Sequence, residues 1–115
     1  AVLSAARQIN GIHSLDIVAH EIQPELDKDA QLISASAAFR KVDSTAGVLI
    51  LVDSPGGTAD KTAAQLAQLG TPARRVSGLS LPMLLRVMHY PEQELDDLAR
   101  TAAAGGRNGV VIDHA

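Results

Sequence analysis

The chain contains no cysteine and no tryptophan, and only one tyrosine and one phenylalanine among its 115 residues. Without cysteine it forms no disulfide and offers no thiolate for zinc binding or nucleophilic catalysis. Nucleic-acid binding is disfavoured as well, because stacking rings are scarce and the formal net charge is -3. No apolar run approaches the roughly 18 residues that cross a bilayer, and no leader peptide is visible. We therefore expect a cytoplasmic protein that does not itself enter a membrane.

The composition that remains is typical of one folded domain. Apolar residues make up 46% of the chain and charged residues 20%, which is too apolar for a disordered protein. At 12.0 kDa the chain can bury roughly two-thirds of the surface that its unfolded form exposes. No repeat or linker divides the sequence, so we expect a single domain over residues 1–115.

Strand-like and helix-like segments alternate along the chain. The patterns predict strands at 14–22, 47–53, 75–79 and 109–112, and helices up to residue 10 and at 28–41, 58–69, 81–90 and 92–104. The segment 47–53 (GVLILVD) is apolar throughout before its Asp, which is typical of a central strand covered on both faces of a parallel sheet. The alternation implies βαβ units. The predicted fold class is α/β, with three layers and a doubly wound, mostly parallel sheet.

Apolar spacing predicts which helix faces are buried. In the helix at 28–41 the expected core face is Leu26, Ala30, Ile33 and Ala37. In the helix at 81–90 it is Met83, Leu84, Val87 and Met88. Gly105 and Gly106 are expected to end the helix at 92–104. The pair Arg74 and Arg75 is interpreted as a solvated pair before an edge strand.

A ligand site is expected where the strand at 47–53 ends, because ligands of parallel α/β sheets lie beyond the carboxyl ends of the strands. There Asp53 is followed by Ser-Pro-Gly-Gly-Thr and a helix. Gly56 and Gly57 lack the Cβ atoms that would block an oxyanion, the helix start presents unpaired N–H groups, and Thr58 adds a hydroxyl. These features suit a phosphoryl group. Asp53 can orient a histidine by accepting its ring N–H.

The same residues have a purely structural interpretation, which the spacing alone does not exclude. The two glycines would then form only a tight turn, with Thr58 and Asp53 as helix caps. A nucleotide-binding loop is disfavoured, because Lys61 does not directly follow the glycines as in a Walker loop and no G-x-G-x-x-G occurs.

Three segments, GVLILVDSPGGT, RVSGLSLPMLL and LARTAAAGGRNGVVI, resemble the IIA domain of the mannose family of the bacterial sugar phosphotransferase system. The family pattern has a buried strand ending in Asp, two residues, Gly-Gly and then Ser or Thr. A later Gly-x-Asn-x-Pro-Met-Leu segment reads here from Gly78 to Leu84. Ser80 departs from the usual Asn, and Ala59 from the Pro that often follows the hydroxyl residue. The resemblance extends from the first residue to about Ile112.

The resemblance implies a phosphotransferase component without metal or other cofactor, which relays a phosphoryl group from the phospho-histidine carrier protein to a IIB domain. In the family the acceptor histidine ends a first strand, just before a helix similar to AVLSAARQING, so it is expected upstream of Ala1. Asp53 would orient that ring, and Gly56, Gly57 and Thr58 would hold phosphate oxygens. The resemblance also implies a homodimer in which the last strand crosses to the partner's sheet edge. The link to the membrane would be indirect, through the sugar permease components.

Three alternatives to this interpretation remain. His20, in the segment IVAH, is similar to the family's I-V-x-H, but Glu21 stands where the family has Gly and the expected helix precedes the histidine. The chain could also be a non-catalytic regulatory or interaction module of the same fold that has lost the histidine. An aspartyl phospho-receiver with Asp53 as acceptor is disfavoured, because the acidic pair and the later lysine of receivers are not visible.

Overall fold

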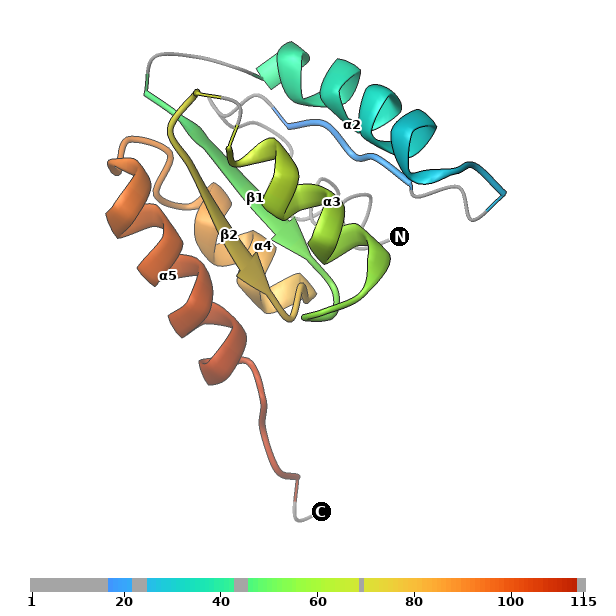
Figure 1. The fold of residues 1–115 in the computed structure, drawn as a ribbon. Coiled ribbons are helices and arrows are strands. Elements are labelled where there is room, and N and C mark those ends of the chain that lie inside the picture. The colour runs from blue at the N-terminus through green and yellow to red at the C-terminus, as the bar shows by residue number, and fades with distance from the viewer. Residues whose placement is uncertain (1–16, 22–24, 43–45, 69, 114–115) are drawn as a thin grey trace.

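The computed structural model describes residues 17–21, 25–42, 46–68 and 70–113. Its elements are α2 (Lys28–Val42), β1 (Val48–Val52), α3 (Thr58–Leu66), β2 (Ala73–Ser77), α4 (Leu81–Met88) and α5 (Leu95–Asn108). The two strands pair in parallel, with Val48 opposite Ala73 and Val52 opposite Ser77. Helices lie on both sides of this sheet, so the α/β class is confirmed (Figure 1). The helix predicted up to residue 10 lies outside the described residues.

β1 is apolar along its whole length because both of its faces are covered. Successive side chains of a strand point to opposite faces of the sheet. Val48 and Ile50 pack on one side into a cluster with α2 and α3, of which the buried members are Ala35, Phe39 and Leu66. Leu49 and Leu51 pack on the other side against α4 and α5, where the buried members are Met83, Val87, Leu98 and Ala102. The expectation of a strand covered on both faces is confirmed.

Glycines allow α4 and α5 to approach closely. A Cβ atom on Gly105 would lie 2.7 Å from the Cβ of Arg86, and one on Gly106 would lie 2.9 Å from the Cε of Met83. The predicted helix end at these two glycines is wrong, because α5 continues to Asn108. A glycine inside a helix costs only about 1 kcal/mol, and close packing against α4 offsets that cost.

The apolar spacing predicts the buried face correctly in α4 but not in α2. The stripe predicted for α4 is confirmed, since Met83, Leu84, Val87 and Met88 are all at most 7% exposed. The face predicted for α2 is wrong: Ile33 is 69% exposed, and the buried residues are Gln31, Ala35 and Phe39. Phe39 carries the largest apolar side chain of α2 and packs in one cluster with Val48. Residues four and eight positions before it share its face of the helix, and therefore they are buried with it.

Two predicted strands do not form within the described residues. Residues 17–21 are extended but belong to no sheet, so the strand predicted at 14–22 is not observed there. Residues 109–113 continue from α5 away from the body of the molecule, and they form no strand (Figure 1). A strand forms where its main-chain groups pair with those of a neighbouring strand, and no described strand pairs with either segment. The sheet therefore has two described strands, and β1, predicted as central, has β2 on one edge only.

Candidate functional site

The candidate site lies where the chain leaves β1 and turns into α3. Asp53 follows the last residue of β1 and is exposed. The N–H of Gly78 donates to the carbonyl oxygen of Asp53 at 3.2 Å, and the N–H of Leu79 donates to that of Val52 at 2.9 Å. Gly78 has a φ of +86°, which glycine adopts without steric cost. The loop after β1 and the turn after β2 therefore meet at the carboxyl edge of the sheet, where the sequence predicts the site.

The loop after β1 ends at an open helix N-terminus. Gly57 is the N-cap of α3, and no side chain caps the helix. Thr58 is the first helical residue, so the interpretation of Thr58 as a cap is wrong. The N–H groups of Gly57, Thr58 and Ala59 open the helix and have no intrahelical acceptor. Such groups, at the positive end of the helix dipole, are suited to bind an anion.

Asp60, in the first turn of α3, holds the loop in place. One of its carboxylate oxygens, Oδ2, accepts a hydrogen bond from the N–H of Gly56 at 2.7 Å. The N–H of Gly56 is thus occupied within the protein, while its φ of +77° makes the turn. Asp60 is not among the site residues predicted from the sequence. The available signal was an acidic residue three positions after the N-cap, as in a capping box.

An ion pair with a buried carboxylate connects this helix to the sheet. Asp60 is only 8% exposed, and its Oδ1 lies 2.9 Å from the Nε of Arg75 on β2. That contact lacks hydrogen-bond alignment, and it is therefore mainly electrostatic. The Nη1 of Arg75 donates to the carbonyl oxygen of Asp60 at 3.4 Å. Arg74 instead pairs with Asp96 of α5 at 2.6 Å. Both arginines are exposed, as expected for a solvated pair, but they lie within β2 rather than before a strand, and each pairs with an aspartate.

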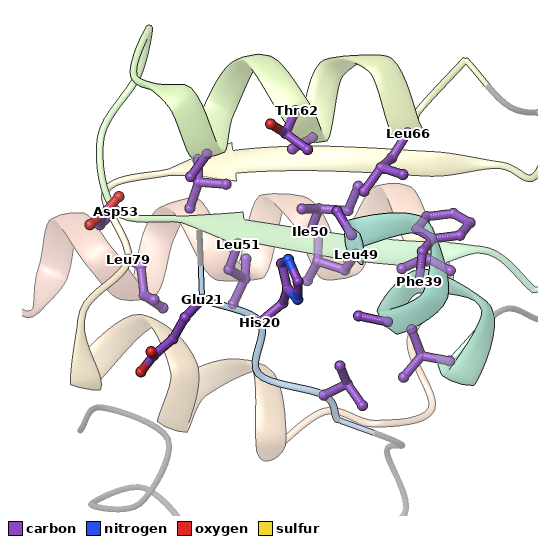
Figure 2. A pocket seen from close by; sticks show the side chains of 18 residues that line it. His20, Glu21, Phe39, Leu49, Ile50, Leu51, Asp53, Thr62, Leu66 and Leu79 are labelled. Carbon is purple, nitrogen blue, oxygen red and sulfur yellow. The ribbon is translucent and has the colours of Figure 1, made fainter. Parts of the chain in front are cut away.

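A cavity of about 580 Å³ runs along β1 (Figure 2). Every residue from Val48 to Asp53 lines it, although successive side chains point to opposite faces of the sheet. The cavity therefore follows an edge of the strand rather than one face. No residue of β2 is among its lining residues, so this is the edge opposite β2. Its remaining walls come from α2, α3, Leu79 and the extended residues 18–21.

Two of the residues considered in the sequence, Asp53 and His20, line this cavity at different places. Asp53 lies where β1 ends, whereas His20 faces the middle of the strand (Figure 2). The carboxylate of Asp53 accepts the N–H of Ser54 at 2.9 Å. The structure brings Asp53 together with the Gly56–Thr58 loop at one edge of the sheet, and it places His20 apart from them.

The fold and site define a class of protein: an α/β domain in which a glycine-rich loop connects a buried parallel strand to an open helix N-terminus. The family model of the PTS system fructose IIA component, EIIA-man, matches residues 1–102. The chain belongs to this family, whose members are EIIA components of the sugar phosphotransferase system. The resemblance described above is confirmed.

A solved structure agrees with the family in fold. The crystal structure of phosphotransferase system component EIIA from Streptococcus agalactiae is similar to this chain with a TM-score of 0.79 and 23% sequence identity. The match covers 96% of this chain and 85% of that one. No curated protein matches the sequence. In the parts of the chain that the structure describes, no group of three or more His, Cys, Asp or Glu is arranged to hold a metal ion, and no helix is long and apolar enough to cross a membrane.

Proposed function

We propose that the chain is the body of a cytoplasmic phosphocarrier. It takes a phosphoryl group from the phospho-histidine carrier protein and passes it to a IIB domain, using a histidine that precedes Ala1. Membership of the EIIA-man family supports the relay and both partners. The link to the membrane is indirect, through the permease that receives the sugar.

The observation that carries the proposal is the cavity along β1. The edge of β1 that borders it pairs with no described strand, and its main-chain N–H and C=O groups need partners. A strand added there would lie about 4.8 Å from β1 and satisfy those groups. If it ran parallel to β1, its carboxyl end would lie beside Asp53. We propose that the strand bearing the histidine occupies this position.

A histidine at that end would meet the groups that phosphoryl transfer needs. One ring nitrogen attacks the phosphorus of the donor phosphohistidine, so that a new N–P bond forms while the donor N–P bond breaks. Asp53 accepts the N–H of the other ring nitrogen and stabilises the charged ring. The N–H groups of Gly57 and Thr58 bind the phosphoryl oxygens, while Gly56 shapes the turn. The same steps in reverse direction deliver the group to the IIB domain.

We also propose a homodimer, as the resemblance implies. Val110, Val111 and Ile112 are 77–80% exposed at the end of the described chain. Three adjacent apolar side chains in an extended segment are suited to pairing with a sheet edge of a second copy. Burial against the partner would remove this apolar surface from water.

Intact-mass spectrometry tests the phosphocarrier. The 115-residue chain and a longer chain that begins upstream are each incubated with phosphoenolpyruvate, enzyme I and the histidine carrier protein. We expect a gain of one phosphoryl mass in the longer chain only, also when it carries His20→Gln. Acid-labile phosphate on the 115-residue chain would contradict the upstream position and point to His20. No phosphate on either chain would contradict the relay and favour a non-catalytic module.

A further inference from the structure

We infer that Arg75 is a positioning residue of the phosphoryl site, which acts by neutralising Asp60. The inference rests on the proposed function and deepens it. Asp60 stabilises the loop that shapes the site, but its charge opposes the ligand that the site is proposed to bind. Arg75 removes this conflict, because it cancels the charge and leaves the loop contact intact.

The conflict arises from the position of Asp60. Its carboxylate accepts the N–H of Gly56 at 2.7 Å, immediately beside the N–H groups of Gly57 and Thr58. A carboxylate in the first turn interacts favourably with the helix dipole, and thereby uses up part of the positive potential that would attract an anion. Asp60 is 8% exposed, so water screens its charge poorly. A phosphoryl group that binds to these N–H groups would meet a negative charge at close range.

Arg75 is placed to cancel that charge. Its Nε lies 2.9 Å from Oδ1 of Asp60, the carboxylate oxygen that does not contact Gly56. Its Nη1 also contacts the carbonyl oxygen of Asp60 at 3.4 Å, which anchors the guanidinium to the first turn of α3. The side chain of Arg75 is 37% exposed, whereas that of Asp60 is 12% exposed. The guanidinium therefore covers the buried carboxylate from the solvent side, and the pair has no net charge.

The neighbouring arginine provides a matched control. Arg74 lies on the same strand and carries the same charge, but it pairs with Asp96 of α5 and not with Asp60. Arg74→Gln and Arg75→Gln change the net charge of the protein equally. They differ in which aspartate loses its partner, Asp96 in Arg74→Gln and Asp60 in Arg75→Gln.

The test measures the initial rate of phosphorylation by the phospho-histidine carrier protein, using the longer chain. We expect Arg75→Gln to lower kcat/KM about tenfold, since one uncompensated buried charge then faces the phosphoryl group. High salt should recover little of this loss, because Asp60 is buried and salt screens buried charges much less than exposed ones. Arg74→Gln should stay within about twofold of the unaltered chain, because its ion pair is exposed. An equal loss in both variants would assign the effect to general attraction of the donor protein and overturn the inference.

Asp60→Asn separates a positioning role from a structural one. The amide oxygen can still accept the N–H of Gly56, but the negative charge is gone. We expect this variant to be phosphorylated faster than the unaltered chain even though it loses the ion pair and melts at a lower temperature. The double variant Asp60→Asn with Arg75→Gln should recover the rate lost in Arg75→Gln. A purely structural ion pair would instead lower the rate and the melting temperature together in Asp60→Asn.

The outcomes distinguish this inference from the proposed function. If the unaltered longer chain gains no phosphate, both are overturned. If it gains phosphate and Arg75→Gln does so at the same rate, only the inference is overturned. Circular dichroism of each variant shows whether it is folded at the assay temperature. If Arg75→Gln does not fold, the phosphorylation rate of Asp60→Asn tests the inference by itself. A rate for Asp60→Asn at or below that of the unaltered chain would contradict the inference.

Discussion

The two sides of the β1–β2 sheet are filled to different extents. On the side of α4 and α5, Met83, Val87, Leu98 and Ala102 are each at most 7% exposed, and glycines bring the two helices together. On the side of α2 and α3 the buried residues are equally covered, but a cavity of about 580 Å³ lies between these helices, the edge of β1 opposite β2 and the extended residues 18–21. Protein interiors normally pack as densely as organic crystals, so the cavity marks an incomplete layer.

We expect the two sides of the sheet to contribute differently, one mainly to stability and the other mainly to function. We expect the side of α4 and α5, which we call the closed side, to supply most of the stability, because its apolar contacts are complete. The side of α2 and α3, which we call the open side, carries the loop of the candidate site and the position proposed for a further strand. Regions with fewer buried contacts open more readily, and functional segments are drawn from such regions. Matched substitutions on the two sides test this division.

The largest contrast is expected from two leucines of equal burial. Leu98 on the closed side is 7% exposed, and Leu66, which lines the cavity on the open side, is 6% exposed. Leu98→Ala should lower the free energy of unfolding by about 3 kcal/mol because it creates a new void in a complete layer. Leu66→Ala should cost about 2 kcal/mol, the low end of the range for such changes, since it only enlarges an existing cavity. Urea unfolding measures both values, and equal losses would contradict the division.

Two glycines with positive φ provide the second contrast. Gly47 (φ +100°) directly precedes β1, and a Cβ there would lie 2.7 Å from the Cδ2 of Leu95 and 2.8 Å from the carbonyl oxygen of Pro72. Gly56 (φ +77°) has nothing within 4 Å of its Cβ position. Gly47→Ala should cost about 2 kcal/mol from combined backbone strain and overpacking, and Gly56→Ala about 1 kcal/mol from backbone strain alone. Thermal unfolding checks both, and a larger effect at Gly56 would show that the open loop is more constrained than its surroundings indicate.

The smallest contrast comes from adding two methyl groups to a helical alanine. Ala102 is 0% exposed in α5, whereas Ala38 in α2 lines the cavity. Valine has the same lower helix propensity at both positions, so the difference between them reports packing. Ala102→Val should cost about 1.5 kcal/mol, and Ala38→Val at most about 0.5 kcal/mol because the cavity has room for the added atoms. Urea unfolding midpoints measure the loss of stability in both variants. A similar loss in both would mean that the cavity cannot accommodate the added methyl groups.

Much of the fold could be predicted from local patterns. The start of α3 at Thr58, the strand β1 and the buried stripe of α4 are confirmed, because each depends on residues that are close in the sequence. The placement of Asp53 and the loop at the carboxyl edge of the sheet is confirmed for the same reason, since a parallel strand followed by a helix leaves them there. Their roles in phosphoryl binding stay predictions.

Other features could not be read from the sequence, because they depend on distant partners. The apolar spacing of α2 predicts Ile33 as core, but contact with β1 selects the face of Phe39 instead. Gly105 has the local character of a helix terminator, yet packing against α4 keeps it helical. The sequence predicts Arg75 as a solvated residue, because its partner Asp60 lies fifteen positions away and contacts it only in the folded chain.

The sequence by itself determined the α/β class, the order of the described helices and strands, and the loop that follows β1. Periodicity, glycines and the apolar strand act over a few residues, and tertiary contacts rarely override them where they agree. Only the tertiary structure decided which face of α2 is buried, which charges are paired and which edge of β1 pairs with no described strand. Those properties arise between segments that meet only when the chain folds, and therefore no local pattern contains them.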